Sequence, residues 1–356
     1  MRASTYQYLT KKWPCALGST FACVRAERRT GLHAKSSEPF TKRPLMLTII
    51  LDALVPVFFG LALGYLAGWT RDVNNTHVAE LNVLVMDFAI PAAIFATVAQ
   101  ASRATLMGQL GLAAILSLSM LLLYGAIYLM AVCVYRATPA EAAVQACTTS
   151  LPNYAAAGLP LISALLGNAG SVSAAVSIAC GAIVVSPLTL VILESTAQKP
   201  GERHIGGVLM RAFRKPIVLS PLLAVLFAAT GIGLPELATR SLVLIGQVAG
   251  GTALFLTGLI LSAQKLRLGR SAGIQTLTAN VVHPLLAAGL AWLFAVSPLT
   301  AREAIVLSAL PAGFFGILFG LRFGISSEVV GTTVIASTIL SALTLAAAIY
   351  LTAGMS

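Results

Sequence analysis

The sequence predicts an all-α integral membrane protein with ten transmembrane helices in two inverted five-helix repeats. Of its 356 residues, 58% are hydrophobic and 10% are charged, whereas soluble domains average about 25% charged residues. Mean hydropathy is +0.89. Apolar segments long enough to cross a bilayer follow one another along the chain, and helix-breaking residues recur at matching places in its two halves. These observations indicate a polytopic membrane protein with internal symmetry.

Ten apolar segments separated by short polar stretches are the predicted membrane spans. Each is close to the 20 or so residues that a helix needs to cross a hydrocarbon core of roughly 30 Å. The lipid bilayer is therefore the first partner that the sequence predicts. The spans cover residues 48–69, 78–99, 107–135, 142–166, 171–194, 216–233, 241–262, 274–297, 303–321 and 328–353.

The fourth segment is predicted to be interrupted. It carries Pro152, Asn153, Gly158 and Pro160 close together, and each of these residues is unfavourable inside an intact helix. Breaking a helix in hydrocarbon frees N–H and C=O groups that protein, ion or water must satisfy. In secondary transporters, interrupted helices of this kind form the substrate cavity near the middle of the membrane.

A shift of about 159 positions places the second half of the chain on the first. It puts Pro311 on Pro152, which makes the ninth span the counterpart of the fourth, and it puts Gly250 on Pro91 in the seventh and second spans. Because five spans is an odd number, the two halves must lie in the membrane in opposite orientations. We therefore expect interrupted fourth and ninth helices that cross each other.

The chain is expected to divide into four parts. Residues 46–195 form the first repeat, 196–215 a cytoplasmic linker loop and 216–356 the second repeat. Residues 1–45 are a basic extension with a net charge of +7, and so dense a positive arm would resist export. We expect the native fold to begin near Met46, and a targeting peptide is the alternative interpretation of the extension.

Lysine and arginine are concentrated in alternate loops, which predicts the orientation in the inner membrane. One set of loops holds only Arg103, Arg240 and Arg302. With the other set cytoplasmic, both termini of the ten-span core lie outside. The excess positive charge resides in the extension and the loops, so nucleic-acid binding is not predicted. The cytoplasmic set comprises Arg71, Arg136, Lys199, Arg203, Arg211, Arg214, Lys215, Lys265, Arg267, Arg270 and Arg322.

Neither an enzyme nor a cofactor or metal site is predicted. The five cysteines form no C-x-x-C pair and no pattern with histidine that suits a metal. The sequence also has no H-E-x-x-H motif and no P-loop. An intramembrane enzyme that uses Asp87 and His283 is the remaining enzymatic interpretation.

The crossing of the two interrupted helices is predicted to bind an organic anion. A helix that begins at a break presents free N–H groups and the positive end of its dipole, which hold an anion without lysine or arginine. The side-chain amide of Asn153 can donate to a carboxylate, and glycine allows close backbone approach. The candidate substrate residues are Thr149, Pro152, Asn153, Tyr154, Gly158, Pro160, Pro311, Gly313 and Phe314.

Three residues within spans, Asp87, His283 and Gln247, are candidates for proton or cation coupling. A charge in mid-membrane is costly and is usually paired, protonated or functional. Asp87 is therefore either a coupling group or a neutral acid bonded to carbonyls freed by Pro91. His283 titrates near neutral pH in water, or it satisfies a neighbouring carbonyl. Gln247 either lines the cavity or joins two helices.

Four features stand in order along the chain: Leu81-Asn82 to Pro91, Asn153-x-x-x-x-Gly158-x-Pro160, His283-Pro284 and Pro311. With this order the chain resembles the auxin efflux carrier family, whose bacterial branch includes malonate-transporter-like permeases. The resemblance covers nearly the whole chain from Met46, and it implies ten spans in two inverted repeats with crossed fourth and ninth helices that bind a carboxylate near Asn153. The chain departs from the family pattern at Ala312, where a polar contact from the ninth helix would lie.

The predicted function is secondary transport of a small organic anion, a mono- or dicarboxylate such as malonate, by alternating access. A sodium-coupled organic-acid or bile-acid-like symporter and a cation/proton antiporter are the alternatives of similar architecture. Those that rely on an acidic pair would show adjacent carboxylates in a broken span, and the core sequence has none. Coupling to H⁺ or Na⁺ and assembly as a homodimer stay open.

Overall fold

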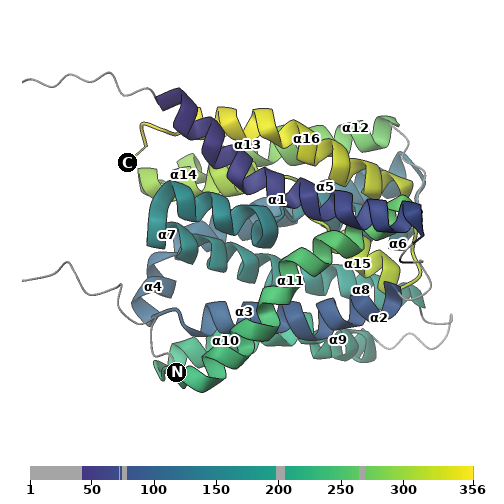
Figure 1. Cartoon of the computed structure of the whole chain (residues 1–356), viewed down its shortest axis with the longest axis horizontal. Coiled ribbons are helices and arrows are strands. Elements are labelled where there is room, and N and C mark those ends of the chain that lie inside the picture. The colour runs from purple at the N-terminus through teal and green to yellow at the C-terminus, as the bar shows by residue number, and fades with distance from the viewer. Residues whose placement is uncertain (1–41, 72, 74–77, 198–204, 264–268, 356) are drawn as a thin grey trace, which may run out of the picture. The chain divides into compact units, whose positions relative to one another are not determined.

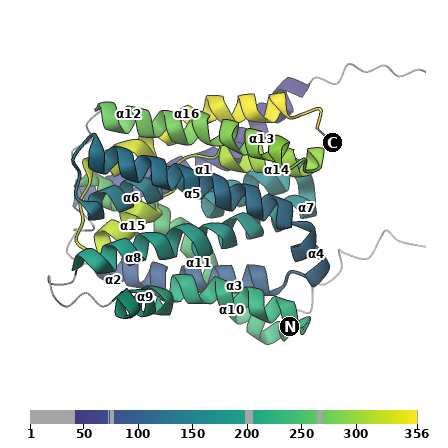
Figure 2. The same ribbon diagram turned by 180° about the vertical axis from the view of Figure 1, so that it is seen from behind.

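The protein is built from α-helices and short π-helical turns (Figure 1; Figure 2). The computed structural model describes residues 42–71, 73, 78–197, 205–263 and 269–355, and this part of the chain contains no β-strand. The α-helices are α1 (Lys42–Thr70), α2 (Val78–Val83), α3 (Ile90–Ala99), α4 (Arg103–Gly108), α5 (Leu110–Cys133), α6 (Pro139–Ser150), α7 (Leu159–Cys180), α8 (Ser186–Ala197), α9 (Ile205–Arg214), α10 (Pro216–Thr230), α11 (Glu236–Ser262), α12 (Arg270–Leu277), α13 (His283–Leu293), α14 (Pro298–Ser308), α15 (Phe315–Arg322) and α16 (Glu328–Leu351). The π-helical turns are η1 (Leu84–Ala89), η2 (Tyr154–Gly158), η3 (Gly181–Val185) and η4 (Thr278–Val282).

Among the described residues, six helices are long and apolar enough to cross a membrane, and a seventh is added if the bent pair Gly206–Arg214 and Pro216–Thr230 forms one span. The expected first span contributes a shorter apolar helix, Leu54–Thr70. The expected fourth and ninth spans are each divided into shorter helices. An all-helical, membrane-spanning architecture is therefore confirmed, whereas helix length alone does not establish ten spans.

Each π-helical turn comes just before a proline. The turns η1, η2, η3 and η4 end two residues before Pro91, Pro160, Pro187 and Pro284, respectively. Proline has no N–H to donate, and its ring clashes with the carbonyl of the residue four positions earlier. A π-helical turn holds one more residue than an α-helical turn, so it takes up this misfit without ending the helix. These prolines therefore loosen spans rather than break them.

The helices form two groups that pack mainly among themselves. In bundle A, comprising α1 to α3 with η1, α10 and α11, α1 runs along α11, and α3 packs against both α10 and α11. Bundle B comprises α5 to α8 and α12 to α16 with η2, η3 and η4. Here α5 packs against α6, α7, α13 and α14, and α16 packs against α12 and α6.

Glycine brings α1 and α11 of bundle A into backbone contact. A Cβ atom at Gly64 would lie 1.9 Å from the carbonyl oxygen of Phe255, and one at Gly258 would lie 2.0 Å from that of Leu61. Membrane helices use small residues at such interfaces because van der Waals packing drives their association. The sequence signal of this contact is the Gly60-x-x-x-Gly64-x-x-x-Gly68 spacing in α1.

The start of the fold and the linker differ in detail from the expectation. Most of the expected extension, residues 1–41, lies outside the described residues, and α1 begins at Lys42, before Met46. Within the expected linker 196–215, the structure contains a helix, α9, which meets α10 at an angle of 72°.

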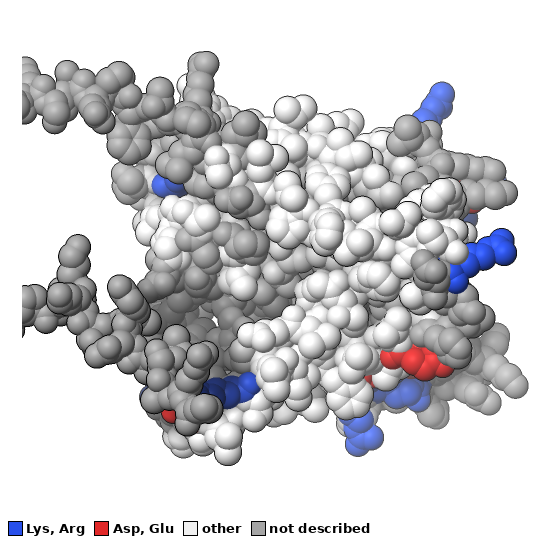
Figure 3. All heavy atoms as spheres, viewed as in Figure 1, with Lys and Arg blue, Asp and Glu red and all other residues white. Residues whose placement is uncertain are grey.

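The described surface is largely apolar where the helices face outward. In Figure 3, the broad middle of the visible face carries no described Lys, Arg, Asp or Glu atoms, and the charged side chains lie towards its edges. Large apolar side chains are exposed on both bundles, including Phe59 (63% exposed) and Trp292 (83%). A surface of this kind suits the hydrocarbon of a bilayer, which offers no hydrogen bonds.

Candidate functional site

The two interrupted helices meet at their breaks. Between α6 and η2, and again between α14 and α15, the chain leaves the helical conformation, and Pro152 pairs with Ala312 in an antiparallel β-bridge. The Asn153 N–H donates to the Pro311 carbonyl oxygen at 2.9 Å. The structure therefore brings Pro152, Asn153 and Pro311 together, although Pro152 and Pro311 are far apart in the sequence. We call this place the crossing.

Backbone groups that the breaks free from helical pairing find partners within the protein. The Gly313 N–H donates to the Thr148 carbonyl oxygen at 3.2 Å. The Ala312 N–H donates to the Ser337 hydroxyl at 2.8 Å, and that hydroxyl donates to the Asn280 side-chain oxygen at 2.6 Å. Because an unsatisfied backbone group in hydrocarbon is costly, Ser337 and Asn280 stabilise the break in the ninth span.

Two helical segments begin at the crossing. Asn153 caps η2, which continues as α7, and its Oδ1 atom accepts from the Ala156 N–H at 3.1 Å. The structure gives the Nδ2 group of Asn153 no hydrogen bond within the described part of the chain. On the other side, α15 follows Phe314 and has no side-chain cap. At the start of η2, the N–H groups of Asn153, Tyr154 and Ala156 already have partners, in the Pro311 and Pro152 carbonyl oxygens and the Asn153 side chain. The available donors are therefore the Nδ2 group of Asn153 and the first N–H groups of α15, which have no partner within that helix.

The helices that lead into the two breaks also begin alike. Thr138 caps α6 and is followed by Pro139, whereas Ser297 caps α14 and is followed by Pro298. Both caps use a side-chain oxygen to accept from a backbone N–H in the first turn, and proline is well suited to the first helical position. The two starts are related by the same shift of about 159 positions that relates the breaks.

A small cavity lies at the crossing. Its volume is about 20 Å³, and its walls include Ile94 of α3, Pro152, Tyr154 of η2 and Phe315 of α15. Such a volume holds about one water molecule, so a dicarboxylate would require the cavity to widen. Tyr154 is buried, and its hydroxyl donates to the Met120 sulfur at 3.8 Å.

Two of the predicted glycines allow close packing around this cavity. A Cβ atom at Gly158 would lie 2.8 Å from the Leu310 side chain, and one at Gly313 would lie 2.2 Å from the Leu151 carbonyl oxygen. Phe314 is buried and stacks on Phe315, with 5.2 Å between the ring centroids. Pro160 is at the start of α7.

Thr149 belongs to a separate buried polar cluster in bundle B. Its hydroxyl donates to the Gln145 carbonyl oxygen at 3.0 Å and to the Gln275 side-chain oxygen at 3.2 Å. The Gln275 side-chain amide in turn donates to the Gln145 side-chain oxygen at 2.7 Å. The structure thus places the Thr149 hydroxyl among amides that join α6 to α12, not among the walls of the small cavity.

Larger cavities also lie between the bundles, including one of about 450 Å³ with walls from α1 and α11 of bundle A and from α16 of bundle B. Two further cavities also have walls from both bundles. One, of about 340 Å³, has walls from α2 and α11 in bundle A and from α6, α15 and α16 in bundle B, including Gly316. The other, of about 500 Å³, has walls from α3 and α10 in bundle A and from α5, α7 and η3 in bundle B, including Cys180. The small cavity at the crossing is also lined by both bundles.

Asp87 forms an ion pair that the sequence did not predict. The Arg322 Nη1 atom lies 2.5 Å from Asp87 Oδ1, and Nη2 lies 3.1 Å from Oδ2. The side chains of Asp87 and Arg322 are only 17% and 22% exposed. A two-point contact with guanidinium is strong and directional, and it accounts for a carboxylate at this depth. Asp87 is therefore paired with arginine rather than bonded as a neutral acid to carbonyls near Pro91.

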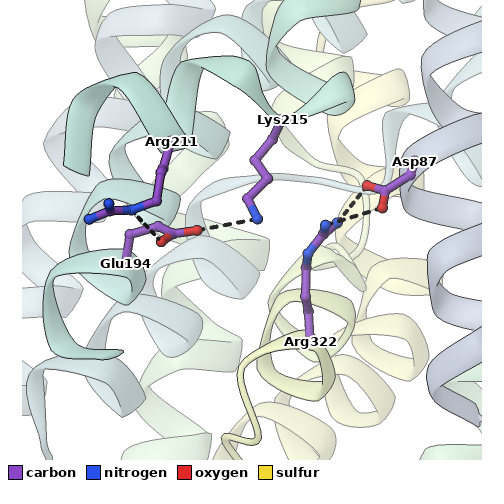
Figure 4. A network of polar contacts seen from close by, with 5 residues as sticks. All are labelled: Asp87, Glu194, Arg211, Lys215 and Arg322. Atoms are coloured by element: carbon purple, nitrogen blue, oxygen red, sulfur yellow. Dashed lines mark hydrogen bonds and ion pairs between the residues drawn. The ribbon is translucent and has the colours of Figure 1, made fainter. Parts of the chain in front are cut away.

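A second charge cluster lies beside this pair (Figure 4). The carboxylate of Glu194, near the end of α8, forms ion pairs with two basic side chains. Its Oε2 atom lies 3.3 Å from Arg211 Nε of α9, and its Oε1 atom lies 3.2 Å from Nζ of Lys215, just before α10. The Lys215 ammonium also lies 5.9 Å from the ring centroid of Phe323, which follows Arg322 in the chain. Both ion clusters therefore connect elements of bundle A or α9 with elements of bundle B.

The other two coupling candidates lie away from the crossing cavity. His283 is fully buried, its Nε2 atom lies 3.2 Å from the Ser119 hydroxyl, and its Nδ1 atom has no hydrogen-bond partner in the described part of the chain. Gln247 is exposed on α11. Neither residue is among those that line the small cavity.

Glu303 of α14 is a buried acid that was not among the candidate residues predicted from the sequence. It is 2% exposed, and its Oε1 atom accepts from the Ser173 hydroxyl at 2.7 Å. The available signal was an acidic residue among apolar ones near the start of the ninth span. For Ser337, which holds the break, there was no comparable signal because serine is frequent at helix contacts in membranes.

One enzyme-like motif is placed in a non-enzymatic context. Residues 269–273 read G-x-S-x-G, and in hydrolases the serine of this motif follows a strand. Here Ser271 is in the first turn of α12, its hydroxyl accepts from the Gln275 amide at 3.1 Å, and no strand occurs in the part of the chain that the structure describes. The motif therefore does not form a nucleophile turn.

Known proteins with similar sequences are transporters. The E. coli (strain K12) protein named "Uncharacterized transporter YfdV" is 27% identical over 304 residues, which cover 83% of this chain and 95% of that protein. The Rhizobium meliloti (strain 1021) protein named "Putative malonate transporter" is 28% identical over 313 residues, which cover 85% and 95%. Residues 49–349 match the model of a family described as membrane transport protein. The chain therefore belongs to this family of membrane transporters, which includes the auxin efflux carriers that its sequence resembles.

Proposed function

We propose that the protein is a secondary carrier of a small organic anion that binds at the crossing. The observation that carries this proposal is the pairing of Pro152 with Ala312, because it holds the starts of η2 and α15 at one place. Helix N-termini attract negative charge. The free amide of Asn153 adds a directed donor for a carboxylate.

The arrangement of cavities supports alternating access. The cavities of about 340 and 500 Å³ and the small one at the crossing are all lined by both bundles. A relative movement of the bundles would widen the crossing towards one large cavity and close it from the other. In this proposal, α6 to α7 and α14 to α15 provide the interrupted fourth and ninth of ten spans.

The orientation in the membrane follows from the charged end of the protein. The start of α1 and the C-terminus lie at the same end of the helices (Figure 1), as an even number of spans requires. Arg211, Lys215 and Arg322 lie in or near the two charge clusters. By the positive-inside rule, the end of the protein that holds these basic residues would face the cytoplasm. The start of α1 and the C-terminus would then lie outside.

A carboxylate is the proposed substrate class, with malonate as the first compound to test. Support comes from the name of the Rhizobium meliloti relative, which is 28% identical, and from the donors at the crossing. Malonate has two carboxylates, so each of the two helix starts could hold one of them.

Uptake of radiolabelled malonate and a panel of mono- and dicarboxylates into proteoliposomes tests this proposal. We expect saturable uptake, and we expect Asn153→Ala to lower kcat/KM about tenfold or more, since a hydrogen bond to a charged group contributes about 1.5–3 kcal/mol. Ser241→Ala, which removes an exposed hydroxyl from α11, is the control and should leave uptake unchanged.

The outcome separates the proposed carrier from its alternatives. Absence of uptake for every acid of the panel, with folded protein, would exclude an organic-anion carrier. Uptake that requires a sodium gradient would identify a sodium-coupled symporter instead. An equal loss of uptake in Asn153→Ala and Ser241→Ala would exclude Asn153 from the binding site.

A further inference from the structure

Glu303 differs from every other described acidic side chain in its surroundings. Within the part of the chain that the structure describes, Glu194 and Glu303 are the buried carboxylates. Glu194 has two cationic partners, whereas no described lysine, arginine or histidine lies within ion-pair distance of Glu303. An ionised carboxylate without a counter-ion is costly in such a place, and protonation removes that cost.

The surroundings of Glu303 can accommodate both protonation states. The Ser173 hydroxyl donates to the carboxylate at 2.7 Å, and a hydroxyl can equally accept from a protonated carboxyl group. The Gln109 amide, which is half-buried at the start of α5, donates to the Ser173 oxygen at 3.3 Å. Gln109, Ser173 and Glu303 therefore form a polar path from a partly exposed amide to the buried acid.

Titratable groups on the neighbouring helices do not neutralise Glu303. The helix α14 packs against α5, α7, α13 and α16. Apart from the Ser173 hydroxyl of α7, which is not titratable, none of their described side chains makes an ion pair or hydrogen bond with the Glu303 carboxylate. The titratable and charged groups on these helices and on α14 itself are Tyr124, Tyr128, Cys133, Cys180, His283, Arg302, Glu328 and Tyr350.

The three residues first considered for coupling are less suited to carry a proton. Asp87 is held by Arg322 at two points, so its charge is compensated. His283 is fully buried next to Ser119, and Gln247 is an uncharged amide. Glu303 is the buried acid whose charge is left uncompensated.

Glu303 lies on the helix that leads into the crossing. It precedes Ala309, where α14 ends, by about 9 Å along the helix axis. An ionised Glu303 would repel an anion bound at the start of α15, and a protonated one would not. Each ligand would therefore favour binding of the other, because coupling between two sites is reciprocal.

We propose that Glu303 binds the proton that is carried together with the organic anion. This inference rests on the proposed carrier function. In each transport cycle, the carboxylate takes up one proton when the anion binds, and the Ser173 hydroxyl turns from donor to acceptor while the Gln109 amide keeps its bond to the Ser173 oxygen. The carboxyl group releases that proton with the anion on the other side of the membrane. The proton is bound and released without any other bond being changed.

Proteoliposomes with an imposed proton gradient test the inference. With one proton per malonate dianion, each cycle moves one net negative charge, so the membrane potential is held at zero with an ionophore. A gradient of one pH unit should then drive about tenfold accumulation of malonate in the wild type. Glu303→Gln should lose this accumulation but retain exchange of labelled for unlabelled malonate, because exchange needs no net proton movement. Glu303→Asp, which keeps a carboxyl group, should retain part of the coupling. Glu236→Gln, at an exposed position of α11, is the matched control and should behave as the wild type.

Infrared difference spectroscopy provides a readout that is independent of transport. A carboxylic acid C=O band should appear when malonate is added to the wild type at constant pH, and it should be missing in Glu303→Gln. A pH titration of the same band tests proton binding by Glu303 even with another substrate. Absence of any such band would overturn the inference.

Failure of the inference can be told from failure of the carrier function. Malonate uptake that ignores a pH gradient in the wild type would overturn proton coupling and leave the carrier intact. Unchanged accumulation in Glu303→Gln would overturn the role of Glu303 alone. If no acid is transported, the carrier proposal fails, and with it the coupling.

Discussion

At the scale of single residues, charge inside the spans is compensated by distant partners. Asp87 and Arg322 are 235 positions apart, yet they form a two-point ion pair between η1 and α15. The sequence predicts that an acid in the middle of a span needs a partner. It does not identify which of the basic residues is that partner, because this depends on how the helices pack. For Asn153 the sequence predicted a position at the break, and the structure places its N–H on the Pro311 carbonyl oxygen.

The Asp87–Arg322 pair should contribute a measurable coupling energy. Breaking a largely buried pair leaves one charge without its partner, so Asp87→Asn and Arg322→Gln should each lower the unfolding temperature in detergent. The double variant should lose less stability than the two single variants lose together, and the difference, the coupling energy, should be about 1–3 kcal/mol. The exposed Glu236–Arg240 pair on α11 serves as the control, with about 0.5 kcal/mol or less. Additive effects at Asp87 and Arg322 would contradict the structural pairing.

At the scale of elements, the contact between α1 and α11 depends on the absence of side chains at two glycines. Gly64→Ala or Gly258→Ala would place a Cβ atom about 2 Å from a backbone oxygen of the opposite helix. The helices must then separate, and overpacking of this kind typically costs about 1–3 kcal/mol. Gly125→Ala in α5, where a Cβ meets nothing within 4 Å, should be neutral or stabilising. Thermal unfolding in detergent measures all three, and equal behaviour of Gly64→Ala and Gly125→Ala would refute the close contact.

At the scale of the whole molecule, the sequence predicted helical class and the place of both breaks. These predictions used hydrophobic segments, prolines and the shift of about 159 positions. Such features are local or periodic, so they can be recognised without knowing how the helices pack. The sequence could not predict that Ser337 and Asn280 stabilise the ninth-span break, or that α9 lies within the linker. The first depends on which of many polar residues meet, and the second is a short amphipathic helix whose formation depends on its neighbours.

Alternating access makes opposite predictions for the cavities of about 340 and 500 Å³. Cys180 lines the cavity of about 500 Å³, and Ser326 lines the one of about 340 Å³. In chains that retain Cys180 alone or carry Ser326→Cys alone, malonate should change the rate of labelling by N-ethylmaleimide in opposite directions, because opening one cavity closes the other. Mass spectrometry of the intact protein measures both rates. A chain that retains only Cys147, which is fully buried, is the control and should label slowly throughout. Parallel changes at Cys180 and Ser326→Cys would instead indicate a pathway open to both sides at once.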